Sequence, residues 1–117
     1  MVVAVVNDLM FTSKIRSAAT QLGVTVTFAR SRDAALAAIR DQRPSLVILD
    51  LNDSAADPLG LVAAVRRDSA IQDTPTVGFV SHVQAELVDA ARAAGIGDVM
   101  ARSAFTQRLP ELLERGR

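Results

Sequence analysis

Short apolar runs alternate with longer segments of helical periodicity along the whole chain. Residues 2–6 and 46–49 are continuous apolar runs, which is typical of strands that are covered on both faces. Positions 24, 26 and 28 are apolar and alternate with two threonines, which indicates a strand with one face less buried. Runs at 77–80 and 99–101 complete a predicted set of five strands.

A helical pattern follows each predicted strand. Polar caps, prolines and glycines mark the expected helix ends. The first helix is expected to begin at Thr12 or Ser13 and to end at Gly23, and the second to begin after Ser31 and to end before Pro44. The third is expected to begin near Pro58, the fourth to span residues 84–94 and end at Gly95, and a short fifth to have Pro110 at its first position. Arg66, Arg67 and Asp68 are expected at a solvated end of the third helix, where the arginines complement the helix dipole.

The order of these elements predicts an α/β fold. Five βα units favour a doubly wound, five-stranded parallel sheet with right-handed crossovers and helices on both faces. The length of 117 residues is typical of one domain, so residues 1–117 are predicted to form a single domain.

Composition narrows the classes of function. The formal net charge is zero, which gives no basic field for nucleic acid or for an anionic membrane surface. The absence of cysteine excludes disulfides and thiolate chemistry, and a single histidine excludes a zinc site built on several histidines. No apolar run is long enough to span a membrane and no signal peptide begins the chain, so a cytoplasmic location is predicted.

Candidate chemistry lies after the strands, because ligands of open parallel sheets bind outside the carboxyl ends of the strands. The polar and neighbouring residues at these positions are Asn7, Asp8, Asp50, Asn52, Asp53, Val80, Ser81, His82, Arg102 and Ser103. An aspartate after a strand is ordinarily a helix cap or a solvated loop residue. Asp50, however, directly follows a fully apolar strand, and a carboxylate there favours a partner, a metal ion or a raised pKa.

The motifs Asn7-Asp8, Leu49-Asp50-Leu51-Asn52 and Thr74-Pro75, together with the element order, resemble a response-regulator receiver domain of the CheY-like family. The resemblance covers essentially the whole chain. It implies a flavodoxin-like sheet of order 2-1-3-4-5 and a phosphoryl group transferred to Asp50 from a histidine kinase or phosphotransfer protein. The domain would modify itself and would not be an enzyme acting on other substrates.

The resemblance also implies a Mg²⁺ site. The acidic pair of the family falls on Asn7 and Asp8, and Asn52 matches the position whose backbone carbonyl binds the metal. Asp8, Asp50 and that carbonyl would still offer three oxygen ligands, with Asn7 acting weakly through water. Since Asn7 removes one negative charge, weakened Mg²⁺ binding is expected.

Several active-site positions depart from the family pattern. The switch Ser/Thr falls on Val80, and the adjacent Ser81 would face the other side of the strand unless a bulge turned it. The family lysine falls on Arg102, whose planar fork is not equivalent to an ammonium. The family cis-proline falls on Ser103, so a trans peptide bond is expected there, and the aromatic switch position holds Val99.

Two main hypotheses follow. Asp8 and Asp50 favour a receiver that still accepts a phosphoryl group, with atypical switching. Asn7, Val80 and Ser103 favour a pseudo-receiver, an interaction module that works without phosphorylation. Another flavodoxin-like function is a third alternative. A flavin or dinucleotide carrier is disfavoured because no glycine-rich loop follows the first strand and no Trp or Tyr is present.

The expected partners are a phosphodonor protein and a downstream output protein or domain. The surface of the fourth helix, fifth strand and fifth helix is a candidate homodimer face. Its residues include Asp89, Arg92, Ala93, Asp98 and Arg108. His82 is expected to lie exposed at the start of the fourth helix, and neither direct nucleic-acid binding nor membrane binding is expected.

Overall fold

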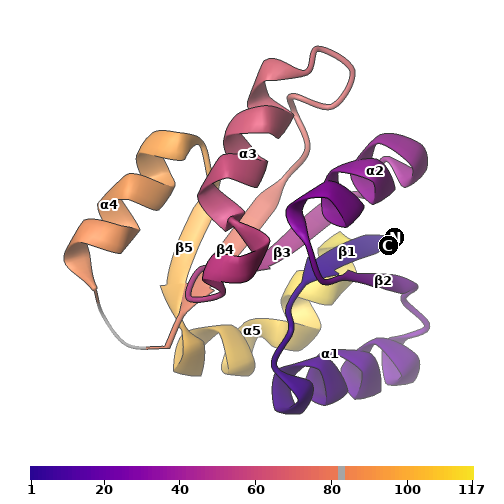
Figure 1. The fold of residues 1–117 in the computed structure, drawn as a ribbon. Coiled ribbons are helices and arrows are strands. Elements are labelled where there is room, and N and C mark those ends of the chain that lie inside the picture. Colours follow the sequence, from indigo (N-terminus) through magenta and orange to yellow (C-terminus); the bar gives the residue numbers. More distant parts are fainter. Residues whose placement is uncertain (82–83) are drawn as a thin grey trace.

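A computed structural model describes residues 1–81 and 84–117, and Figure 1 shows its fold. Over these residues the strands are β1 (Val2–Val5), β2 (Val26–Ala29), β3 (Leu46–Asp50), β4 (Thr76–Val80) and β5 (Asp98–Ala101). The α-helices are α1 (Leu9–Leu22), α2 (Arg32–Gln42), α3 (Pro58–Arg67), α4 (Ala85–Ala94) and α5 (Arg102–Arg115), and a short 3-10 turn, η1, spans Ser54–Ala56.

The strands form one parallel sheet of order β2-β1-β3-β4-β5, which confirms the predicted fold class. β3 lies at the centre, where every one of its residues is buried. Its register places Asp50 beside Phe79 of β4. Asp50 is therefore the last residue of the central strand, at the edge where parallel α/β sheets bind their ligands.

Helices cover both faces of the sheet (Figure 1). One apolar cluster joins α2, α3 and α4 to side chains such as Val47 and Leu49, and the other joins α1 and α5 to Ile48 and Phe79. Neighbouring residues of β3 thus alternate between the two clusters, as the pleat of a strand requires. Among the described helices, none is both long and apolar enough to cross a membrane.

Local caps explain where most helices begin and end. Ser31 caps α2 by accepting a hydrogen bond from the amide of Ala34, as predicted. Gly23 and Gly95 close α1 and α4 in the left-handed region, with φ of 69° and 107°. Asp57 precedes Pro58 and accepts from the amide of Gly60, so α3 begins where the proline predicted.

The prediction for the start of the first helix was wrong. α1 begins at Leu9, because Asp8 is its cap and accepts hydrogen bonds from the amides of Met10 and Phe11. Thr12 lies buried inside the helix, and its hydroxyl donates to the carbonyl of Val6. The cap is thus the aspartate that the sequence also marked as a metal ligand.

The prediction for the last helix was also wrong. α5 begins at Arg102 and contains Pro110 in its interior. Phe105, Leu109 and Leu112 are buried against α1 and the sheet. Because their burial outweighs the helix-breaking tendency of an exposed proline, the helix begins about two turns before that proline.

Arg66 is not the solvated residue that the sequence predicted. Its Nε donates to the carbonyl of Gly95 at 3.0 Å, and its two terminal nitrogens reach the carbonyls of Gln72 and Thr74 and the hydroxyl of Thr76. The side chain therefore joins the end of α3 to the start of β4 and to the turn after α4. Asp68 pairs with Arg40 at 2.9 Å, whereas Arg67 is exposed as expected.

A candidate phosphoacceptor site at the carboxyl edge of the sheet

Asp50 is the most deeply buried charged side chain among the described residues, with 6% of its surface exposed. One carboxylate oxygen accepts a hydrogen bond from the amide of Asn52 at 3.0 Å. Burial raises the pKa of Asp50 above its ordinary value, and the charges of Asp53 and Asp8 raise it further, while the Asn52 amide and Arg102 act against this rise. A raised pKa is one of the three properties that the sequence analysis favoured for a carboxylate at this position.

Asp8 lies on the neighbouring loop, after β1. One of its oxygens caps α1, at 2.8 Å from the amide of Met10, and the other lies 4.0 Å from a terminal nitrogen of Arg102. Asp8 is close enough to Asp50 to influence its pKa. The two carboxylates therefore share one edge of the sheet, as the sequence indicated, but Asp8 already contacts the first amides of α1 and Arg102.

Asn7 contacts two loops through its side-chain amide. Its Nδ2 donates to the carboxylate of Asp53 and, at 3.1 Å, to the carbonyl of Arg30. Sequence reasoning named Asp53 only as a loop residue. A partner 46 positions away has no local pattern that could have revealed this pairing.

Asn52 connects the loop after β3 to the loop after β4. Its Oδ1 accepts from the amide of Ser81 at 2.7 Å, and its Nδ2 donates to Oε1 of Gln84 at 2.8 Å. Gln84 is the residue directly before α4, so the Asn52 side chain links the segment after Asp50 to the start of that helix. The sequence had assigned only the backbone carbonyl of Asn52 a role.

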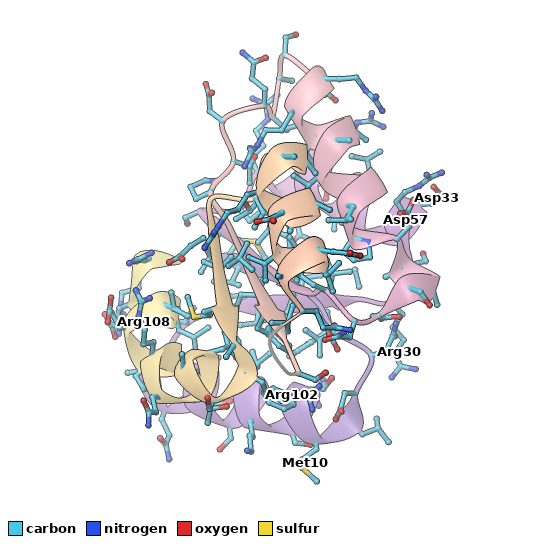
Figure 2. The ribbon with its side chains drawn as sticks, turned by 90° about the vertical axis from the view of Figure 1, so that its left-hand side faces the viewer. Met10, Arg30, Asp33, Asp57, Arg102 and Arg108 are labelled. Atoms are coloured by element: carbon cyan, nitrogen blue, oxygen red, sulfur yellow. The ribbon has the colours of Figure 1, made fainter. Side chains whose placement is uncertain are left out.

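Arg102 lies on an aromatic cluster at the same edge of the molecule. Its guanidinium carbon is 4.4 Å from the ring centroid of Phe11 and 6.0 Å from that of Phe79, and Phe79 stacks in turn on Phe105. Within the described residues, its Nε is buried without a hydrogen-bond partner. Figure 2 shows Arg102 at the end of the molecule where α1 and Met10 also lie.

The remaining candidate positions are described by their burial, hydrogen bonds and backbone geometry. Val80 is buried, with 2% of its surface exposed, and brings no hydroxyl to the site. Ser81 is exposed, and its amide binds Asn52. No cis peptide bond occurs in the described residues, so Ser103 follows a trans bond, as expected. Val99 is half-buried and packs against the cluster beneath α4, whereas His82 lies outside the described residues.

The expected metal ligands do not form a tight cluster. Among the described residues, no group of three or more acidic or histidine side chains is placed to hold a metal ion. The donors at this edge are nevertheless hard oxygen atoms, and Mg²⁺ is commonly held by one or two carboxylates plus water and phosphate oxygens. Asp8, Asp50 and the Asn52 carbonyl therefore fit Mg²⁺ binding in their chemistry.

The surface predicted as a dimer face carries charges that are paired within the chain. Arg108, labelled on α5 in Figure 2, lies 3.6 Å from Asp98 and 3.4 Å from Glu111. Asp89 and Arg92 are exposed on α4. Dimerisation through this face stays a prediction.

The fold and the site together define a doubly wound α/β domain with an acidic edge centred on one buried aspartate. No protein-family model matches the sequence, and no curated protein matches it. Solved structures match it over nearly its full length. A response regulator from Hahella chejuensis is 23% identical with a TM-score of 0.86, covering 97% of this chain and 91% of that one.

Two further solved structures match the chain over nearly its full length. The chemotaxis response regulator CheY4 of Vibrio cholerae is 22% identical with a TM-score of 0.83, and the receiver domain of NtrX from Brucella abortus is 23% identical with a TM-score of 0.81. Each covers 99% of this chain and is itself covered to 97%. This chain has the fold of response-regulator receiver domains.

Proposed function

We propose that residues 1–117 form a single receiver-type signalling domain and that Asp50 is its phosphoryl acceptor. The observation that carries this proposal is the position of Asp50. It is a buried carboxylate at the end of the central strand, with Asp8 and Asp53 near it and the cationic Arg102 within electrostatic reach. A buried carboxylate with a raised pKa is a candidate functional group on physical grounds alone.

The proposed reaction is the transfer of a phosphoryl group to a carboxylate oxygen. The Asp50 oxygen forms a bond to phosphorus while the bond from phosphorus to the donor breaks, and the leaving group keeps that electron pair. With a phosphohistidine donor the leaving group is the imidazole nitrogen, and with acetyl phosphate it is acetate. Such transfers depend on positioning and on neutralisation of the phosphoryl oxygens.

Arg102 supplies positive charge for this neutralisation. No hydrogen bond or ion pair joins Arg102 to Asp50 within the described residues, yet its charge lowers the pKa of Asp50. Its Nε is buried and has no hydrogen-bond partner in the part of the chain that the structure describes, so a phosphoryl oxygen would reach this atom only after the side chain moved. Asp8, Asp50 and the carbonyl of Asn52 would hold Mg²⁺, weakly because Asn7 is uncharged. When bound, the ion would neutralise part of the phosphoryl charge.

A second candidate function is a phosphorylation-independent interaction module. It is favoured by Val80, which has no hydroxyl to approach a phosphoryl oxygen, and by the Asn52 bridge to Ser81 and Gln84, which already joins the two loops. For the receiver function, the proposed partners are a histidine kinase or phosphotransfer protein and a downstream output protein, with the cytoplasm as the proposed location.

The test is the intact mass of the protein after incubation with acetyl phosphate, with and without Mg²⁺. We expect a Mg²⁺-dependent phosphoryl adduct that is lost in Asp50→Asn. The matched control is Asp89→Asn, which removes an exposed aspartate from α4 and is expected to retain the adduct. No adduct in a folded sample would exclude the receiver chemistry and leave the interaction module.

A further inference from the structure

The side chain of Asn7 is a donor at a position surrounded by acceptors. It is half-buried between the loops that follow β2 and β3. Its Nδ2 donates to the Asp53 carboxylate and to the carbonyl of Arg30, so both amide hydrogens have partners. These two bonds join segments 23 and 46 residues distant from Asn7.

This edge of the sheet concentrates negative charge. The carboxylates of Asp8 and Asp53 both raise the pKa of Asp50, so each of them repels the ionised Asp50. Each of the three carboxylates has a protein donor, and that of Asp50 is the amide of Asn52. Asp8 faces Arg102 and the first amides of α1, and Asp53 faces the Asn7 amide.

We propose that Asn7 is a positioning residue that replaces a metal ion in holding the loop after β3. Its amide orders Asp53 and the Arg30 carbonyl without any cation. The asparagine is then a functional substitution and not merely the loss of a metal ligand.

The substitution Asn7→Asp would replace the hydrogen-bond donor at this position with an acceptor. A carboxylate has no hydrogen to donate, so the new side chain would face Asp53 and the Arg30 carbonyl as a third acceptor. A divalent cation such as Mg²⁺ would bridge the three oxygen groups. Restoring the acid of the family pattern should therefore destabilise the metal-free protein and make its stability depend on Mg²⁺.

The experiment is thermal unfolding of the full chain in EDTA and in millimolar MgCl₂, followed by circular dichroism. The wild-type Tm should be nearly independent of Mg²⁺. Asn7→Asp should lower the Tm in EDTA by about 4 °C or more, and Mg²⁺ should restore it. Gln107→Glu, which adds the same charge at an exposed site on α5, is the matched control and should show neither effect.

The swapped variant separates positioning from general damage. Asp53→Ala alone should lower the Tm because it removes the acceptor of the Asn7 amide. Asn7→Asp combined with Asp53→Asn exchanges donor and acceptor and should recover part of the loss in EDTA. If Asn7→Asp does not fold in either buffer, the comparison of this variant with the double variant tests the proposal. Recovery of folding in the double variant supports the proposal, and failure to recover overturns it.

Two further results would overturn the proposal. One is an Asn7→Asp variant as stable as wild type in EDTA, and the other is an Asp53→Ala variant with unchanged Tm. Asn7 lies beside the proposed phosphoacceptor site, so its role rests on the proposed function. The unfolding experiment contains no phosphodonor, so a failure of Asp50 to accept a phosphoryl group would be recognised separately.

Discussion

The guanidinium of Arg102 lies over the ring of Phe11, with its carbon 4.4 Å from the ring centroid. This contact positions the cation at the first turn of α5, beside Asp8 and away from hydrogen-bonding distance of Asp50. A cation at a helix N-terminus opposes the helix dipole, so the aromatic face and Asp8 are what stabilise it there. If Arg102 serves anion binding as proposed, its guanidinium should contribute little to folding stability.

Arg102→Met tests this expectation through stability. The substitution keeps an unbranched side chain on the Phe11 ring and removes a buried Nε that has no partner among the described residues. We expect the free energy of unfolding, measured in urea, to change by less than about 1 kcal/mol. Phe11→Ala, by contrast, should lower it by about 3–5 kcal/mol. A loss of similar size in both variants would show that the guanidinium itself stabilises the fold.

Asp50→Asn should increase stability at neutral pH. Burial raises the pKa of Asp50 above 3.8, so the unfolded chain loses its proton at lower pH than the folded protein does. Stability contributed by the protonated form is complete below pH 3.8 and is lost as pH rises through the raised pKa. The Tm of Asp50→Asn should exceed that of wild type at pH 7, and the difference should shrink towards pH 3.8.

The comparison needs a variant that changes charge without changing a buried group. Asp89→Asn removes an exposed carboxylate from α4 and should follow the wild-type curve across this pH range. A wild-type protein more stable than Asp50→Asn at pH 7 would mean that the ionised carboxylate gains more from its hydrogen bond and from Arg102 than it loses by burial.

Arg66→Ala should destabilise the fold strongly for a partly exposed residue. It removes hydrogen bonds to Gly95, Gln72, Thr74 and Thr76 and leaves part-buried acceptors behind. We expect a loss of about 2 kcal/mol in urea unfolding. Arg67→Ala, on the same turn but exposed, should change stability by less than about 0.5 kcal/mol. Equal effects of the two substitutions would contradict the assigned role of Arg66.

Asn52→Ala should loosen the connection between the two loops at the acidic edge. The substitution removes the acceptor of the Ser81 amide and the donor to Gln84. Amide hydrogen exchange at Ser81, measured by NMR, should become about tenfold faster, which corresponds to about 1.4 kcal/mol. Gln84→Ala removes only the second bond and should leave Ser81 protected. Unchanged exchange in Asn52→Ala would show that other contacts hold this loop.

Local patterns predicted the fold because its main determinants are local. Apolar runs located the strands, and Ser31, Gly23 and Gly95 marked helix ends through hydrogen bonds and backbone conformations of neighbouring residues. The start of α1 was predicted wrongly because a second local cap, Asp8, lies before Thr12, whereas the start of α5 was predicted wrongly because distant packing outweighs a local signal. Pro110 is a strong start signal, yet the burial of Phe105 and Leu109 against α1 extends α5 in front of it.

The sequence by itself determined the alternation of strands and helices, and it located Asp50 at the mouth of a buried strand. Only the tertiary structure decided which donor serves each carboxylate: the Asn7 amide for Asp53, Arg102 for Asp8 and the Asn52 amide for Asp50. Hydrogen bonds are directional and act within about 3 Å, and the ion pair of Arg102 with Asp8, at 4.0 Å, also needs close approach. The pairings of Asn7 and Arg102 therefore depend on how the sheet order brings distant loops together, which no local pattern encodes.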